Sequence, residues 1–456
     1  MDKLAIYLEI VPLPVLAIGA IAACIVFAML PANSRPFILI WIMPLWLFLS
    51  KCIDLGAIQA MTKLSSGLLL LMIAVAAWLR PGEKRYVPGI VWLYPAAGVW
   101  MMVCVAGTSN NLDMLLIRGQ GIVMALAAIT LVGSLRDLED LARLMRAMAV
   151  GTTLALIVPF SALAIQGSAA FIPGLHRFEP WGASPNLIGI TFVISGAMLL
   201  YLIMTTKVQL YRLFFMGGFA ANFGFILLTG SRMSFMALSV VSVLMLFPLV
   251  KRPGILIVGG IVGAILIPII TAFEEGAGAR ITELHTSGRF GIWWEYMHIF
   301  VGRPLGLFGT SGHDGLSDAI IGTHAHNAWV DMLYVGGGPL LIMMLVPAII
   351  AAKSVFRTWR SRKLFEYAED QMTIHTSASI MVAMFLQTMT NQTLYYPTFT
   401  WAFLGMVFFM FFISFREDLG RIEAEAAEAW EDAEALEYDQ SSEWDEASIA
   451  TSRNTS

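Results

Sequence analysis

The sequence predicts an all-α fold, a polytopic membrane bundle of about 12–14 spans with one large loop on the outer side of the membrane. Three observations predict this fold. Hydrophobic residues make up 58% of the chain and charged residues only 13%, whereas soluble domains carry about 25% charged residues. Apolar stretches of roughly spanning length follow one another along the chain. The short loops between them are alternately rich and poor in Lys and Arg.

The predicted spans are stretches that come close to the roughly 20 apolar residues that a bilayer requires. The first is taken as a span and not as a cleaved signal peptide, because it follows no basic run and has no convincing cleavage site. The second and third are short, which leaves the total at twelve to fourteen. The expected spans are 10–30, 36–50, 65–79, 88–106, 116–134, 147–165, 187–205, 214–229, 233–250, 255–272, 328–350, 374–393 and 398–415.

The orientation of the bundle follows from clusters of Lys and Arg in every second loop, since such loops stay in the cytoplasm. The clusters are Arg80/Lys84/Arg85, Arg136/Arg143/Arg146, Lys207/Arg212, Lys251/Arg252 and Lys353/Arg357/Arg360/Arg362/Lys363. The loops between them then face outward: 107–115, 166–186, 230–232, 273–326 and 394–397. The side of the N-terminus stays open, because the first two spans are ambiguous.

The chain divides into a membrane domain, 1–415, and an acidic tail, 416–456, which this orientation places in the cytoplasm. The tail holds 13 of the 32 acidic residues but only 3 of the 28 basic ones. We expect it to be partly helical near 422–436 and disordered beyond. Two charged amphipathic segments, Arg136–Arg146 and Lys353–Gln371, are predicted to be helices on the cytoplasmic surface of the membrane.

Several function classes lack their usual sequence signs. The three cysteines, Cys24, Cys52 and Cys104, have no CxxC spacing and indicate neither a disulfide framework nor a zinc site. The sequence has no Walker lysine motif, no GxSxG elbow and no dinucleotide fingerprint. We therefore expect no cofactor and no nucleic-acid partner.

Two outward arginines are candidates for binding an anion. Arg232 lies in the short turn Thr229–Gly230–Ser231–Arg232, where an unpaired guanidinium is costly; the alternative is a snorkelling side chain that anchors the helix end. Arg289 lies close to Trp293 in the large loop, and Arg is suited to bidentate binding of phosphate. Trp293 fits either a surface for sugar rings or the aromatic belt at the membrane interface.

The candidate catalytic residue is His326, within His324–Ala325–His326–Asn327 at the start of a predicted helix. Asn327 is a suitable N-cap, and the free N–H groups of a helix start favour an anion. An imidazole beside a bound phosphate would take a proton near neutral pH. The alternatives are loop histidines with a structural role and a metal site formed by His313, Asp314, Asp318, His324 and His326.

A second outward loop, 166–186, contains His176–Arg177–Phe178 and Ser184–Pro185–Asn186. Pro185 and Asn186 are also explained by the turn and helix start that follow. That explanation does not account for Arg177 on the outer side. The predicted orientation puts four candidate residues on the same outer side of the membrane: Arg177, Arg232, Arg289 and His326.

These segments resemble the O-antigen ligase and O-antigen polymerase superfamily of bacterial membrane glycosyltransferases. The resemblance covers about 177–345 in motifs and the whole chain in topology. The pattern H-[NSQ]-x9-G-x2-[GTY] runs from His326 through Gly337, but its last position is Leu340. The segments that carry the resemblance are Arg177, Ser184–Pro185–Asn186, Thr229–Gly230–Ser231–Arg232, Ser287–Gly288–Arg289 to Trp293, Arg303–Pro304–Leu305–Gly306, His326–Asn327 and Gly336–Gly337–Gly338.

The resemblance implies a metal-independent, inverting glycosyltransferase in the bacterial inner membrane. Such an enzyme moves a glycan from undecaprenyl pyrophosphate to a hydroxyl of a glycan or lipid acceptor on the periplasmic side, in lipopolysaccharide or another surface polysaccharide. His326 would be catalytic, with Arg232, Arg289, Arg177, His324, Asn327, Trp293 and Asn186 binding substrate. Two alternatives belong to other classes: a secondary transporter or flippase of lipid-linked glycans, and a scaffold that acts through the acidic tail.

Overall fold

The computed structural model describes Tyr7 and residues 9–108, 112–246, 289–302, 327–389 and 400–431. Within these ranges the chain is helical and has no β-strand; Phe171 and Phe178 form an isolated antiparallel bridge. The α-helices are α2 (Leu13–Met29), α3 (Arg35–Leu49), α4 (Ala57–Leu79), α5 (Leu93–Thr108), α6 (Leu112–Ser134), α7 (Leu138–Ala155), α8 (Ile157–Gln166), α9 (Pro185–Thr205), α10 (Gln209–Thr229), α11 (Arg232–Leu246), α14 (Arg289–Gly302), α16 (Ala328–Arg360), α17 (Ala368–Thr388) and α18 (Thr400–Ser414). Short 3₁₀ helices occur at η1 (Ile53–Leu55), η2 (Gly89–Trp92), η3 (Gly167–Ala170), η4 (Pro180–Gly182) and η7 (Ser361–Leu364).

The predicted fold class is confirmed: the protein is an all-α, multi-pass membrane bundle. In the described ranges, six helical stretches are long and apolar enough to cross a membrane, and five shorter apolar helices accompany them. Helices occupy every predicted span except 255–272, which lies outside the described residues. The shorter apolar helices also coincide with predicted spans. Helix length alone therefore does not identify every predicted span in the structure.

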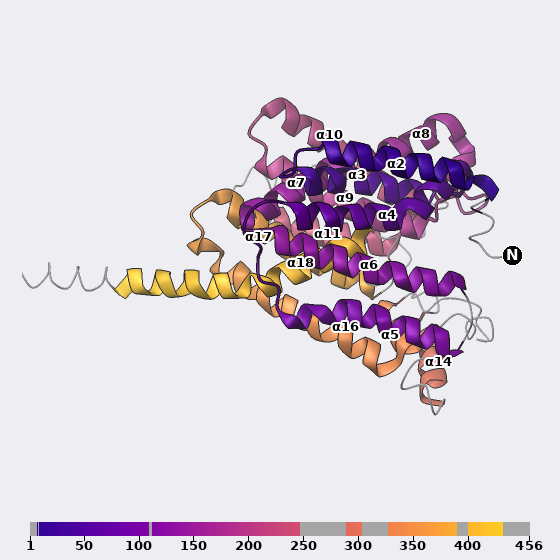
Figure 1. Ribbon diagram of the computed structural model, residues 1–456. Helices are drawn as coiled ribbons and strands as arrows, with labels where there is room; N and C mark the ends of the chain where they lie inside the picture. Colours follow the sequence, from indigo (N-terminus) through magenta and orange to yellow (C-terminus); the bar gives the residue numbers. More distant parts are fainter. Residues whose placement is uncertain are drawn as a thin grey trace, which may run out of the picture.

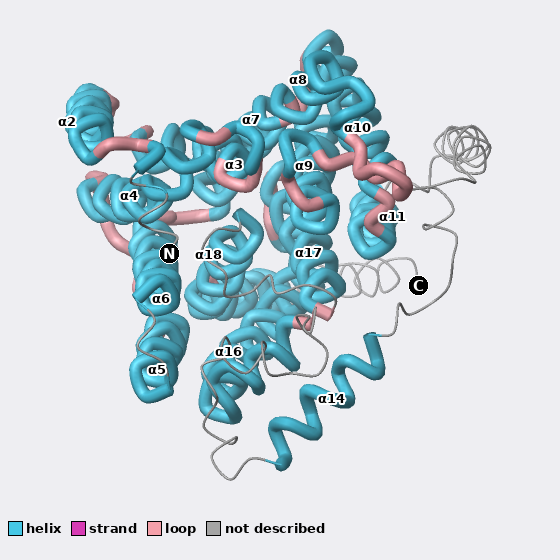
Figure 2. Tube along the Cα trace, turned by 90° about the vertical axis from the view of Figure 1, so that its right-hand side faces the viewer, coloured by secondary structure: helices cyan, strands magenta, loops and turns pink. Residues whose placement is uncertain are grey.

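The bundle is built around α9. Its sequence is apolar on all sides, as expected for a helix with no face toward solvent. It packs against α7, α10, α11, α17 and α18, and Figure 2 shows it enclosed by several of these helices. Two ring stacks extend this core toward the loop that precedes α9. The ring of Phe225 on α10 lies between Phe192 of α9 and Phe178 of that loop, with centroid distances of 5.4 and 5.6 Å.

Neither of the two predicted surface helices is a separate helix, because both segments are parts of helices of the bundle. Arg136–Arg146 contains the first turns of α7, where Asp137 is the N-cap and accepts a hydrogen bond from the amide of Asp140 at 2.8 Å. Lys353–Gln371 divides into the end of α16, the 3₁₀ helix η7 and the start of α17. Among the paired charges of the first segment, Asp140 is buried, whereas Arg136, Glu139 and Arg143 form their ion pairs at the surface.

The partner of Asp140 is Arg80, sixty residues earlier at the end of α4. Two guanidinium nitrogens donate to the two carboxylate oxygens at 2.9 and 2.7 Å, and both side chains are 2% exposed. Arg136 adds two further donors to Asp140, its backbone amide at 3.0 Å and its Nε at 3.1 Å. This end of the bundle, which also carries Arg146 and Arg357, is called the basic end below.

The first part of the acidic tail is a helix, 416–431, that leaves the bundle at the basic end (Figure 1, yellow). Asp418 forms an ion pair with Arg85, and Glu423 forms one with Arg357 while accepting a hydrogen bond from Ser361. The predicted helix at 422–436 therefore begins earlier than expected. Residues 432–456 lie outside the described residues.

We predict that Asp140→Asn strongly destabilises the protein, because it leaves the buried guanidinium of Arg80 without its counter-charge. Losing one partner of a buried pair typically costs about 3–5 kcal/mol. Glu139→Gln is the matched control: it removes a carboxylate from the adjacent residue, whose side chain is 65% exposed and pairs with Arg143. Thermal unfolding in detergent compares the two variants. Equal unfolding temperatures would contradict a stabilising role for the buried pair.

The docking of the tail helix is predicted to depend on pH through Glu423. The hydrogen bond from Arg357, together with that from Ser361, lowers the pKa of Glu423 despite some desolvation. A lowered pKa means that the ionised contact stabilises docking above the ordinary glutamate value of about 4.3 and is lost as the pH falls further. We expect the amide hydrogen exchange of residues 416–431, corrected for intrinsic rates, to become faster only at acid pH, where the contact is lost.

The same contact is tested at neutral pH by Glu423→Gln, with Glu428→Gln as the control on an exposed position of the helix. A partly exposed pair is weak, so we expect exchange to rise roughly two- to fivefold in the first variant only. Identical exchange in both variants would show that the tail helix is held by other contacts.

Candidate functional site

The loop before α9 is fastened to the turn between α10 and α11 by Arg177. This side chain is 7% exposed, and its Nε donates to the carbonyl oxygen of Thr229 at 2.8 Å. Its Nη2 donates to Oδ1 of Asn186, in the first turn of α9, also at 2.8 Å. The amide of Phe178 donates to the carbonyl of Leu228 at 2.9 Å. Three separate segments of the predicted site therefore meet at one place.

The turn between α10 and α11 is compact and presents Arg232 at the start of a helix. Gly230 has φ +60°, a left-handed conformation that suits a residue without a Cβ. The hydroxyl of Thr229 donates to Ile226 at 2.7 Å, and the hydroxyls of Ser231 and Ser234 lie 2.9 Å apart. Arg232 is half-buried. Its place in the first turn of α11 adds a cation to a helix end that already favours anions.

The predicted N-cap of α16 is confirmed. Asn327 is 5% exposed, and its Oδ1 accepts hydrogen bonds from the amides of Trp329 at 3.0 Å and Val330 at 3.2 Å. The carboxamide oxygen of Asn327 is therefore engaged by its own helix. His324 and His326 lie outside the described residues, as do the other members of the alternative metal site, His313, Asp314 and Asp318.

The last turn of α17 lies near the starts of both α11 and α16. Nε2 of Gln387 donates to the carbonyl of Met233, next to Arg232, at 3.3 Å. Thr388, the next residue, lines a groove together with Trp329 in the first turn of α16. The end of the bundle that carries these contacts and the loop of Arg177 is called the loop end.

The helix α14 lies beside α16 (Figure 2). Arg289 is its first residue, and only its backbone is described. Trp293 is partly buried against a pair of tyrosines, Tyr296 of α14 and Tyr334 of α16, whose ring centroids are 5.0 Å apart. Burial, with a smaller contribution from the negative charge of Asp331, raises the pKa of Tyr296. Tyr296 is thus a neutral hydroxyl group at ordinary pH.

The glycine run after Asn327 has a conformational role that the sequence pattern did not reveal. Gly337 interrupts α16 with φ +66° and ψ −162°, a region occupied almost only by glycine. Pro339 has no amide to donate across the break. The indole Nε1 of Trp100 on α5 donates to the carbonyl of Gly336 at 2.7 Å, which satisfies a backbone group beside the break. The glycine of the family-like pattern is therefore the bend in α16.

Sequence reasoning also missed Arg118. It lies in the second turn of α6 and is 4% exposed. A charged residue inside the predicted span 116–134 is the signal that points to it, because intramembrane charges usually have a function. Among the described residues, no group of three or more His, Cys, Asp or Glu side chains is placed to hold a metal ion.

The chain matches no protein-family model and no curated protein.

We predict that Gly337→Ala destabilises the protein by about 1–3 kcal/mol, because alanine is strained in this backbone conformation. Gly224→Ala on α10 is the control, since a Cβ there meets no atom within 4 Å and the position does not require a left-handed backbone. Thermal unfolding of both variants in detergent is the measurement. A Gly337→Ala protein as stable as wild type would show that α16 can straighten without cost.

Proposed function

We propose that the protein is a glycosyltransferase of the O-antigen ligase and polymerase type, which transfers a glycan from undecaprenyl pyrophosphate to an acceptor hydroxyl at the loop end. The observation that carries this proposal is the pair of hydrogen bonds from Arg177 to Thr229 and Asn186. They bring together three segments that resemble the superfamily and are far apart in sequence. Arg177 and Asn186 then act by positioning the turn that carries Arg232.

The chemistry assigned to the site is a single inverting displacement. The acceptor oxygen forms a bond to the anomeric carbon as the bond from that carbon to the pyrophosphate oxygen breaks. The pyrophosphate leaves with the bonding electron pair, and Arg232 and Arg289 stabilise its charge. The acceptor proton passes to the imidazole of His326. The lipid donor already carries an activated sugar, so the reaction requires neither a nucleotide nor a metal.

The basic end is assigned to the cytoplasm, because Lys and Arg of the short loops gather there. The loop end then faces the periplasm of a bacterial inner membrane, and the tail helix lies in the cytoplasm. In this orientation the proposed donor is used after it has crossed the membrane.

The assignment of His326 is tested by substitution. We expect His326→Ala to reduce turnover about 10²- to 10⁴-fold, the range for a positioned general base, with donor binding much less affected. His324→Ala is the control and should cost far less, because residues two apart do not share a direction at a helix start. The measurement is transfer of a lipid-linked glycan by purified protein in detergent, with and without a chelator.

Two outcomes would contradict this assignment. Equal losses in both histidine variants, together with inhibition by the chelator, would favour the metal site instead. Full activity of His326→Ala would remove the histidine from the reaction.

The choice between ligase and polymerase is made by the surface glycans of a deletion strain. Loss of a ligase leaves the polymer attached to its lipid, whereas loss of a polymerase leaves acceptor carrying at most one repeat. A normal glycan profile would contradict both forms of the proposal.

A further inference from the structure

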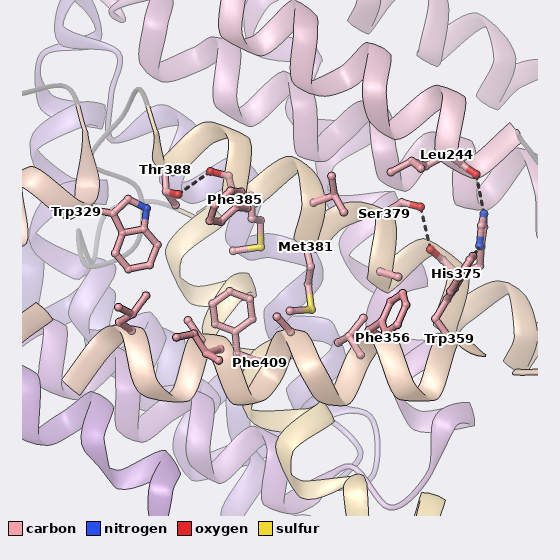
Figure 3. Close-up of a pocket in the computed structure, with 18 residues that line it drawn as sticks. Leu244, Trp329, Phe356, Trp359, His375, Ser379, Met381, Phe385, Thr388 and Phe409 are labelled. Atoms are coloured by element: carbon pink, nitrogen blue, oxygen red, sulfur yellow. Dashed lines mark hydrogen bonds between the residues drawn. The ribbon is translucent and has the colours of Figure 1, made fainter. Parts of the chain in front are cut away.

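An apolar groove runs between α16 and α17 along much of their length (Figure 3). It has a volume of about 510 Å³, and almost all of the surface that lines it is carbon or sulfur. Aromatic rings and methionines form its walls, including those of Phe356, Met381, Phe385 and Phe409. On α17 it extends from His375 to Thr388, about 20 Å at the rise of an α-helix.

The groove is open along one side. Phe356 and Phe385 on its rim are more than half exposed in the absence of a bilayer. Both side chains lie on helices of the membrane bundle, so we infer that the open side of the groove faces lipid. A hydrocarbon chain can therefore enter it from the membrane without passing through water.

The end of the groove nearest the basic end is closed by polar groups that satisfy one another. Nδ1 of His375 accepts a hydrogen bond from the indole of Trp359 at 2.9 Å. Nε2 of His375 lies 2.7 Å from the carbonyl of Leu244 and donates to it. Both ring nitrogens of His375 are thus engaged within the protein. No polar group of a ligand is required at this end.

The opposite end of the groove differs. The indole N–H of Trp329 is buried there and has no acceptor among the described residues. A buried donor without an acceptor carries a free-energy cost that a ligand oxygen would remove. Trp329 is two residues after Asn327, and Thr388 follows Gln387, which bonds to the residue after Arg232. The groove therefore begins between the start of α16 and the end of α17, one residue from the contact of Gln387 with Met233.

We propose that this groove binds the polyprenyl chain of the lipid donor, with the indole N–H of Trp329 donating to the phosphate at its head. This inference rests on the proposed function for the identity of the lipid. The chain lies along α16 and α17, and burial of each CH₂ group contributes about 0.8 kcal/mol. Met381 and Met384 suit a methyl-branched chain, because methionine adapts its shape to irregular surfaces. Binding of the chain fixes the pyrophosphate beside Arg232.

The test is binding of undecaprenyl phosphate to the full-length purified protein, measured by native mass spectrometry in detergent. Dioleoyl phosphatidate is the comparison lipid, since it has a phosphate head but acyl chains without methyl branches. We expect undecaprenyl phosphate to bind about tenfold more tightly. Equal binding of the two lipids would overturn the proposal in favour of an acyl chain in the groove.

Two variants locate the binding within the groove. Val382 lines the groove and is 42% exposed, so Val382→Trp should obstruct it and weaken binding of undecaprenyl phosphate by about tenfold or more. Val103→Trp on α5 is the matched control, because Val103 is 54% exposed and does not line the groove. Equal binding by these two variants would overturn the proposal.

The role of the indole is tested separately with Trp329→Phe, which keeps an aromatic ring and removes the N–H. We expect it to weaken binding of undecaprenyl phosphate and to leave binding of undecaprenol, which lacks the phosphate, unchanged. Unchanged binding of both lipids would overturn the contact with the phosphate.

The glycan-transfer assay separates failure of this inference from failure of the proposed function. Selective binding in the groove by a protein that transfers no glycan would leave the lipid site standing and contradict the proposed function. Normal transfer by Val382→Trp would contradict the lipid site and leave the function standing.

Discussion

The guanidinium of Arg177 is buried and must find its acceptors within the protein, and the rest of the loop end depends on how it does so. One nitrogen donates to the carbonyl of Thr229, the last residue of α10, and another to the side chain of Asn186 in the first turn of α9. Because both acceptors are fixed to helices, the loop lies over the turn that carries Arg232. The stack of Phe178 on Phe225 and Phe192 anchors the same loop in the core.

A second constraint acts along α16. The break at Gly337 lets the first two turns of this helix take a direction different from the remainder, and the bond from Trp100 stabilises the break. Asn327 caps the first part, while the second part lines the groove with α17. The same helix thus joins the position next to His326 to a lipid-facing surface. In the proposed function, one end of the donor reacts at the cap and the other lies along the second part.

Much of the fold was predictable, because apolar length and loop charge reflect the cost of placing polar groups in lipid. The cap at Asn327 was also predictable, since capping depends on neighbouring residues.

The bond from Arg177 to Thr229 joins residues 52 apart and leaves no local pattern. For the same reason Arg136–Arg146 was misjudged: the charge of Asp140 is neutralised by Arg80, 60 residues away. Gly337 was noticed as part of a pattern, but its backbone conformation was not, and the groove arises only when α16 and α17 pack.

We propose that the loop end makes a covalent product and does not simply move a lipid across the membrane. The most direct measurement places the purified protein in liposomes with a lipid-linked glycan and an acceptor, without nucleotide, and follows both glycan transfer and transbilayer movement of the lipid. We expect a glycan–acceptor product with inverted anomeric configuration and no protein-dependent movement of the lipid. Transbilayer movement of the lipid-linked glycan with no product would contradict the account and favour a transporter.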